Sequence, residues 1–138
     1  MNQQTLTFTE YDVERLEIIL EGAQRSASLK KSHLETLADE LEKGDIVSSR
    51  EIGADVVTLN SRVRLRDLDN DKEMEVSLVL PMGANFSEGR LSVTSPLGIA
   101  LLGYTAGSVI EWQGQAGYRK ARIEAVLYQP EAAGHYHL

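Results

Sequence analysis

The chain has 138 residues, which is enough for one ordinary domain or for one small domain with a helical extension. Its composition, 42% hydrophobic and 25% charged, is that of a folded globular protein, and a formal net charge of -7 argues against general electrostatic wrapping of duplex nucleic acid. The absence of cysteine excludes disulfides, thiolate metal sites and cysteine nucleophiles. With no secretory signal and no bilayer-length apolar run, we expect a cytoplasmic protein without a membrane partner.

Two helices are expected in the first 50 residues. From Thr9 to Glu21 apolar residues recur at helical spacing, and Thr9 with Asp12 resembles a capping box with Asp in place of Glu. The second segment ends at Gly44 and carries leucines on one face, at Leu34, Leu37 and Leu41. With about 13 to 15 residues per helix, the pair is expected to form a short antiparallel hairpin, or coiled coil, about 20 Å long.

Beyond residue 50 the helical pattern gives way to alternation. Apolar and polar residues alternate over 57–66 and again over 74–80, which predicts two strands with one buried face each. The segment 67–72 between them has the composition of a hairpin turn, so the strands are expected to be antiparallel neighbours. Further strands are expected in three places: 90–94, 108–112 and 119–128.

One short helix is expected inside this second part. Ser95 and Pro96 are suited to the cap and the first residue of a helix, and Gly103 is suited to its end. The predicted class is therefore α+β, with a helical hairpin over 1–50 and an antiparallel β-sheet domain with one short helix over 51–138. No internal repeat or low-complexity tract divides the chain further.

Several stretches carry a resemblance to a known family. The segment 91–103, LSVTSPLGIALLG, followed by 106–109 and later by Ile123 and Tyr128, is similar to the C-terminal domain of the bacterial Gre transcript-cleavage factors. This resemblance implies an FKBP-like domain that docks on the rim of the secondary channel of RNA polymerase. The stretches 55–63 and 128–134 resemble a short branch of that family, whose members are named regulators of nucleoside diphosphate kinase.

The branch implies two partners, RNA polymerase and nucleoside diphosphate kinase. Regulation of the kinase through transcription would reconcile them, and a direct contact with the kinase stays open. The resemblance places the polymerase contact at the family's docking loop, which corresponds here to Thr94, Ser95, Pro96 and Leu97. Helix capping by Ser95 and Pro96 and core burial of Leu97 explain the same residues without a partner. Thr94 departs from the acidic or amide residue that the cleaving factors have there.

The hairpin tip, taken as Glu21, Gln24 and Arg25, lacks the chemistry of a cleavage factor. In the Gre factors acidic residues at the tip of a long coiled coil complete a metal site in the polymerase, since magnesium prefers several oxygen ligands. Residues 22–28 contain no Asp or Glu, and Glu21 is a single acid that a solvated helix end explains equally well. We expect a non-catalytic regulator that competes with Gre factors, does not stimulate cleavage and needs no cofactor or metal of its own.

A second candidate contact is basic. Arg62, Arg64 and Arg66 stand at alternate positions and would line one solvent-exposed strand face. The alternative explanation pairs them across the hairpin with Glu73 and Glu75. Few aromatic residues are interleaved with these cations, so direct sequence-specific nucleic-acid binding is not expected.

Two other functions are compatible with the sequence. One is that of a regulator that binds nucleoside diphosphate kinase directly and has no transcriptional role. The other, least favoured, is an FKBP-like peptidyl-prolyl isomerase, because the fold alone does not transfer activity. Such isomerases need a pocket lined with several aromatics, whereas this chain is 6% aromatic and Trp112 is its sole tryptophan.

Overall fold

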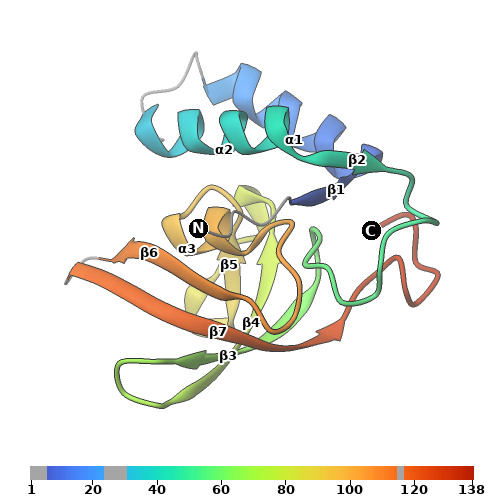
Figure 1. Ribbon diagram of the computed structural model, residues 1–138. Coiled ribbons are helices and arrows are strands. Elements are labelled where there is room, and N and C mark those ends of the chain that lie inside the picture. Colours follow the sequence, from blue (N-terminus) through green and yellow to red (C-terminus); the bar gives the residue numbers. More distant parts are fainter. Residues whose placement is uncertain (1–5, 24–30, 115–116) are drawn as a thin grey trace.

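The computed structural model describes residues 6–23, 31–114 and 117–138, and it places two helices over a curved sheet with a third, short helix between (Figure 1). The α+β class expected from the sequence is confirmed. The elements in chain order are β1 (Thr7–Thr9), α1 (Glu10–Ala23), α2 (Lys31–Lys43), β2 (Asp45–Val47), β3 (Arg62–Asp67), β4 (Glu73–Val79), the 3-10 turns η1 (Pro81–Gly83) and η2 (Phe86–Glu88), β5 (Arg90–Ser92), α3 (Pro96–Leu101), β6 (Val109–Gly114) and β7 (Gly117–Tyr128).

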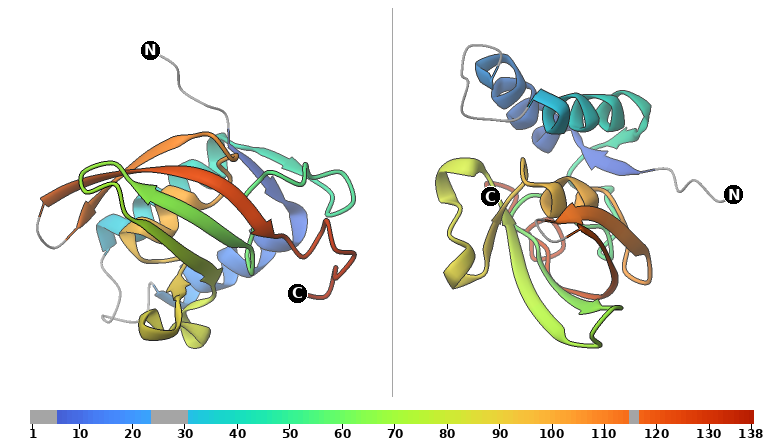
Figure 2. Two further views of the ribbon diagram at one scale, coloured as in Figure 1. Left: turned by 90° about the horizontal axis from the view of Figure 1, so that it is seen from below. Right: turned by 90° about the vertical axis from the view of Figure 1, so that its left-hand side faces the viewer.

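Five strands form the main sheet, in the order β5-β4-β3-β7-β6, and Figure 2 shows how strongly it curves. The pairs β3–β4, β3–β7 and β6–β7 are antiparallel, as expected, but β5 runs parallel to β4. The expectation of a wholly antiparallel sheet is therefore wrong at this edge. Two strands joined by a crossover keep the same direction, and the segment 80–89, which contains η1 and η2, makes that crossover.

The predicted strand over 57–66 is wrong in its first half, since β3 begins only at Arg62. Asn60 has a φ of 69°, and a turn closes around it because the Ser61 N–H donates to the Thr58 carbonyl at 3.0 Å. Val57 and Leu59 are nevertheless fully buried. The alternation in this stretch thus reflects inward-facing apolar residues in an irregular segment, which pairs with the chain at residues 103–104 through the backbone of Val57.

The remaining strands and the hairpin turn lie where the sequence places them, within a few residues. In the turn, Asp67 accepts hydrogen bonds from the backbone N–H groups of Asp69 and Asn70, at 2.8 and 3.4 Å. Asp71 takes a positive φ of 60°, which Asp tolerates better than most residues. The local chemistry of acidic and amide side chains is therefore enough to account for this turn.

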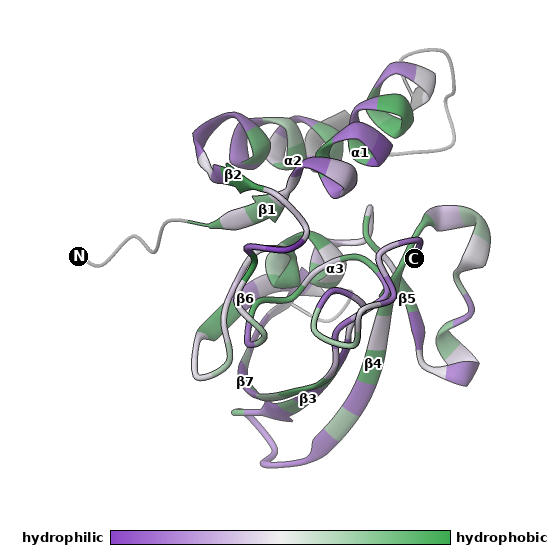
Figure 3. Cartoon of the chain, turned by 90° about the vertical axis from the view of Figure 1, so that its right-hand side faces the viewer, coloured by the Kyte–Doolittle hydropathy of each residue, from purple (hydrophilic) through white to green (hydrophobic). Residues whose placement is uncertain are grey.

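Helices and sheet share one hydrophobic core. It includes Leu16 of α1, Leu37 of α2 and Leu101 of α3, all completely shielded from solvent. Figure 3 shows a largely hydrophobic α3, whereas hydrophilic and hydrophobic residues alternate along α1 and α2, as expected of helices with one buried face. Helix α2 therefore packs on α3 of the sheet domain, and α1 packs on α2 and on strands β1 and β2.

Strands β1 and β2 were not predicted. They pair in parallel as a separate two-stranded sheet that connects the base of the hairpin to the sheet domain, since the Thr7 N–H donates to the Gly103 carbonyl at 3.3 Å. Phe8 lies between two glycines: a Cβ at Gly44 would come within 2.3 Å of its ring, and one at Gly103 within 2.7 Å. Gly44 ends α2 as predicted, and the close approach of Phe8 is a second reason for glycine there.

The expected domain division at residue 50 falls in the irregular connection between β2 and β3. It stays a prediction, because independent folding of the two parts is a separate property. Within the described residues, no helix combines the length and the apolar character needed to cross a membrane.

Candidate functional site

The candidate docking loop runs from the end of β5 into α3 and is held by a dense set of hydrogen bonds. The Ser95 hydroxyl accepts from the Gly98 N–H at 3.1 Å, which is the predicted cap, and donates to the Ser92 carbonyl at 2.7 Å. The Ser92 hydroxyl lies 2.7 Å from that of Thr94 and accepts from the Thr94 N–H at 3.1 Å. The loop is therefore fixed by its own side chains.

Gly98 brings the helix against the backbone of the same loop. A Cβ built at this position would lie 2.1 Å from the Ser92 carbonyl oxygen and 2.9 Å from the Val93 Cα. Both of these atoms belong to the main chain, so a side chain cannot be accommodated without moving the loop. The loop and the first turn of α3 form one close-packed unit.

The four predicted contact residues are not equally available to a partner. Thr94 and Leu97 are each only 7% exposed, whereas Ser95 and Pro96 are partly exposed. Core burial, the alternative explanation for Leu97, is therefore confirmed as its environment. Ser95 and Pro96 carry the accessible side-chain surface of this loop, and polymerase contact by all four residues stays a prediction.

The hairpin tip is only partly described. Glu21 lies exposed in the last turn of α1, while Gln24 and Arg25 fall outside the described residues. Val13, Leu16, Ile19 and Leu20 all pack in or against the core that α1 shares with α2 and the sheet domain. Among the described residues, no group of three or more His, Cys, Asp or Glu is placed to hold a metal ion.

The arginines of β3 form ion pairs, as the alternative explanation expected. Arg62 lies 2.7 Å from Glu75, and Arg66 lies 2.5 Å from Glu73. Arg66 also reaches Glu124 of β7 at 2.9 Å, and this hydrogen bond is the main reason why the pKa of Glu124 lies below its usual range. In the described part of the chain Arg64 is the one of these three arginines that makes no ion pair, and its side chain is partly exposed.

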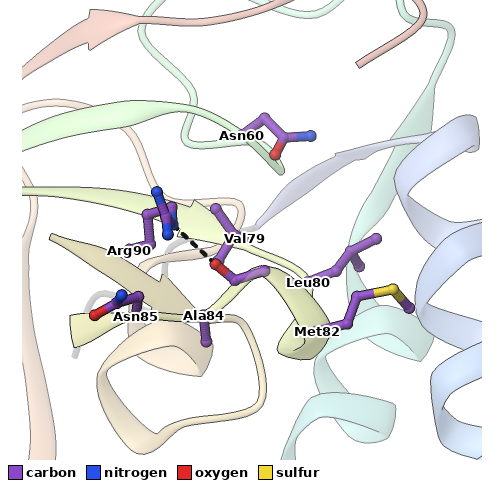
Figure 4. Close-up of a pocket in the computed structure, with 8 residues that line it drawn as sticks. Asn60, Val79, Leu80, Met82, Ala84, Asn85 and Arg90 are labelled. Atoms are coloured by element: carbon purple, nitrogen blue, oxygen red, sulfur yellow. Dashed lines mark hydrogen bonds between the residues drawn. The ribbon is translucent and has the colours of Figure 1, made fainter. Parts of the chain in front are cut away.

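A shallow pocket of about 450 Å³ lies at the β4–β5 edge (Figure 4). The Arg90 side chain lines it and donates to the Gly83 carbonyl at 3.0 Å. The other residues that line it are aliphatic or carry amides: Asn60, Val79, Leu80, Met82, Ala84 and Asn85. No motif in the sequence points to this pocket, because its residues are scattered along the chain. No aromatic ring lines it, unlike a prolyl isomerase site.

A buried polar network lies where α1 meets the sheet domain. Asp12, Thr58, Ser61, Gln129 and Glu131 are all less than 9% exposed. The Thr58 hydroxyl donates to Glu131 at 2.6 Å and lies 2.9 Å from the Ser61 hydroxyl. These residues come from the first helix and from the two stretches, 55–63 and 128–134, that resemble one branch of the family. In the sequence, only the resemblance of these two stretches to one branch of the family pointed to this region, and it assigned no role to these residues.

Burial is the main reason why the pKa of Asp12 is raised, and the nearby Glu131 adds to the rise. The Leu59 N–H and Arg15 oppose it, since both stabilise the ionised carboxylate. The sequence predicted Asp12 as the second half of a capping box. The Thr9 hydroxyl does accept from the Asp12 N–H at 3.0 Å, which is one half of a capping box. In the other half the Asp12 carboxylate would accept from the Thr9 N–H. That half of the prediction is wrong, because the carboxylate accepts from Arg15 and from the Leu59 N–H.

Comparison with known proteins gives concordant results. Residues 50–128 match the family model of the GreA/GreB transcription elongation factor C-terminal domain. The chain is 36% identical to the regulator of nucleoside diphosphate kinase of Escherichia coli (strain K12), over 99% of this chain and 98% of that protein. It is 35% identical to the transcription elongation factor GreA of Chloroherpeton thalassium over 91 residues, which span 66% of this chain and 58% of that protein.

Solved structures agree. A GreA/GreB elongation factor from Nitrosomonas europaea, 35% identical, superposes with a TM-score of 0.74 over 91% of this chain and all of that chain. GreA factor homolog 1 of Thermus thermophilus, 25% identical, gives a TM-score of 0.50 over 91% of this chain and all of that chain. The family model matches more than half of the chain, and the regulator of nucleoside diphosphate kinase is similar to it from end to end. This chain belongs to the GreA/GreB family of transcription elongation factors.

Proposed function

We propose that this protein is a non-catalytic transcription regulator that binds RNA polymerase at the rim of the secondary channel. There it competes with Gre factors and does not stimulate transcript cleavage. The observation that carries the proposal is the combination of a rigid docking loop, within the family-matched segment 50–128, with a hairpin that lies against the body. In this proposal the chain keeps the family's docking loop, whereas its hairpin is too short to extend far into the channel.

The docking half is supported by the geometry of the loop. Ser95 and Pro96 are partly exposed and are positioned by the capping hydrogen bonds and by the close packing of Gly98. A rigid loop loses little conformational entropy when a partner binds. Thr94 and Leu97 would then act mainly by holding the loop in shape.

The non-cleaving half is supported by length and by charge. Helices α1 and α2 have 14 and 13 residues, so each is about 20 Å long at 1.5 Å per residue. Because α2 also packs on α3, less than that length extends freely. Glu21 is the single acid near the tip, and one carboxylate is a poor ligand set for a magnesium ion that needs several oxygens.

The finer architecture belongs to the same proposal. We infer that the sheet domain over 51–138 is of the FKBP-like class, that the hairpin over 1–50 is a short coiled coil, and that the protein acts in the cytoplasm. The curved sheet around one short helix supports the first inference. The contact between α1 and α2 supports the second.

The experiment uses purified core RNA polymerase and fluorescently labelled full-length protein. Saturable binding that an unlabelled Gre factor displaces is expected, and Ser95→Ala should weaken it. Ser87→Ala is the matched control, since Ser87 is an exposed serine in η2, outside the docking loop. Absence of binding, or binding that a Gre factor leaves unchanged, would contradict the docking half.

Cleavage is tested on the same material. A polymerase halted in a backtracked state is incubated with this protein and, separately, with a Gre factor. Shortened transcripts are expected only with the Gre factor, and this protein in excess should slow that cleavage. Cleavage stimulated by this protein alone would contradict the second half.

A second candidate function is direct binding of nucleoside diphosphate kinase. It is favoured by one observation, the name of the relative that is 36% identical over the whole chain. Mixing the two purified proteins and following their co-elution tests it without polymerase. Co-elution together with no polymerase binding would favour this alternative. Peptidyl-prolyl isomerase activity is the least favoured function, because a fold alone does not transfer activity and the chain is only 6% aromatic.

A further inference from the structure

The C-terminal tail, defined as residues 129–138, folds back across the molecule to the start of α1. Figure 1 shows the tail in red beside the segment that follows β2. It lies outside the segment 50–128 that the family model matches, and the docking proposal assigns it no role. Its contacts fall into two groups, one with the irregular segment 53–61 and one with α1.

The first group fixes the tail to the sheet domain. The Gln129 amide donates to the carbonyls of Gly53 and Val56, both at 2.7 Å, and Glu131 accepts from the Thr58 hydroxyl at 2.6 Å. Gln129 is 3% exposed and Glu131 7% exposed. Buried hydrogen bonds to a charged group are among the stronger polar contacts, so this end of the tail is firmly anchored.

The second group joins the tail to α1. The Arg15 guanidinium donates to the Leu138 carbonyl at 2.7 Å and to the Asp12 carboxylate at 2.5 Å. The Tyr11 hydroxyl donates to the His137 carbonyl at 3.5 Å, and Arg15 also stacks over the Tyr11 ring, 3.9 Å from its centre. One arginine on the helix therefore links the last residue of the tail to a carboxylate that is itself bound to segment 53–61.

The described part of the hairpin has other attachments, and the apolar face of α1 lies in the shared core. Strand β1 is bonded to Gly103, and α2 packs against α3 through its leucines. These contacts hold the base of the hairpin and its α2 side. Arg15 is the residue through which the end of the tail restrains α1, so removing it should widen the range of directions that α1 takes relative to the sheet domain.

We propose that the tail is a clamp that fixes the direction in which the hairpin leaves the sheet domain. Arg15 is its key positioning residue. Given the proposed function, on which this consequence rests, the clamp also sets the spacing between hairpin tip and docking loop that is presented to polymerase. The clamp is built by residues that the elongation-factor domain model does not cover.

The test measures the hairpin direction without polymerase. Because the chain has no cysteine, spin labels can be placed specifically at Glu17→Cys on α1 and Lys72→Cys in the β3–β4 turn, both exposed positions. Double electron–electron resonance should give one narrow distance distribution for the otherwise unchanged protein. The distribution should broaden or shift in Arg15→Met and in a chain shortened by residues 135–138, all four of which are exposed.

Arg50→Met is the matched control. Arg50 also holds the tail, with its guanidinium 4.6 Å from the centre of the Tyr136 ring, but it is not part of α1, so the narrow distribution should persist. Unchanged distributions in both Arg15→Met and the shortened chain, with the fold intact by circular dichroism, would overturn the clamp. If Arg15→Met does not fold, the shortened chain decides alone, because it removes no buried residue.

Measuring the binding of the same variants to polymerase distinguishes failure of the clamp from failure of the docking proposal. If both hold, Arg15→Met should bind polymerase about two- to ten-fold more weakly, since only molecules with the correct hairpin direction are competent to bind. If no variant and not even the unchanged protein binds, the docking proposal fails, while the spin-label distances still decide the clamp.

Discussion

Asp12, in the first turn of α1, accepts a hydrogen bond at 2.9 Å from the backbone N–H of Leu59, which is 47 residues away along the chain. Both residues are almost completely buried. The carboxylate thus satisfies a buried main-chain N–H group of the irregular segment. This one contact ties the start of α1 to the irregular segment.

Replacing Asp12 should therefore destabilise the fold strongly. Asp12→Ala leaves the Leu59 N–H without a partner and Arg15 without its carboxylate, at a cost of about 3 kcal/mol. Asp12→Asn should cost less, because an amide oxygen can still accept from Leu59. Urea unfolding followed by circular dichroism measures both, and Glu14→Ala, exposed on the same helix, should change the free energy of unfolding little. Equal effects of Asp12→Ala and Glu14→Ala would contradict the role given to this contact.

The sequence predicted the regular elements because their signals are local. Thr9 and Ser95 cap helices through their own hydroxyls, and the acidic turn after β3 forms with its own side chains. What it did not predict depends on distant partners. The three-residue strands β1 and β2 are too short to show a period, and they form because Phe8 packs between Gly44 and Gly103.

The candidate site divides in the same way. The docking loop was identified from its motif, and its cap was correct because capping involves neighbours in the chain. The burial of Leu97 depends on the fold, because its neighbours come from distant parts of the chain. The network around Asp12 joins three separate stretches, so no spacing in the sequence reveals it. The alternation over 57–61 predicted a strand that the structure does not have there. The physical reason is that buried apolar residues can alternate in an irregular segment as they do in a strand.

Two glycine substitutions should have opposite effects. In Gly98→Ala the new Cβ would meet the Ser92 carbonyl oxygen, so the docking loop must move and both stability and polymerase binding should fall. Gly22→Ala places a Cβ in open space near the end of α1, where alanine favours the helix by up to about 1 kcal/mol. Thermal unfolding compares the two variants. A Gly98→Ala protein as stable as the parent would show that the loop is not tightly packed.

The two neighbouring arginines of β3 should also differ. Arg66 bridges β3 to Glu73 of β4 and to Glu124 of β7, whereas Arg64 makes no ion pair within the described residues. Arg66→Ala should lower the Tm more than Arg64→Ala, and the difference should shrink at high salt because exposed pairs are screened. If polymerase uses this face, Arg64→Ala should weaken binding at unchanged Tm. A larger loss of Tm in Arg64→Ala would contradict the ion-pair geometry.

Glu40 should make stability depend on pH. This residue of α2 is partly buried, its Oε2 has no hydrogen-bond partner among the described residues, and burial raises its pKa from 4.5 to about 7. The folded state therefore holds a proton that the unfolded chain releases near pH 4.5, so the free energy of unfolding should fall as the pH rises from 4.5 to 7. Above pH 7 the carboxylate is charged in both the folded and the unfolded state, so the folded protein bears the full cost of burying that charge.

Glu40→Gln removes this penalty, because the neutral amide keeps nearly the same shape. At pH 8 it should be more stable than the parent by about 1 to 2 kcal/mol, less than the full shift implies because solvent still reaches part of the side chain. The pKa of the neighbouring Tyr104, which burial raises and the Glu40 charge raises further, should drop in this variant. Urea unfolding at pH 5 and pH 8 measures the gain, and Glu42→Gln, exposed on the same helix, is the control. An equal gain at both pH values would show that the Glu40 carboxyl does not titrate between them.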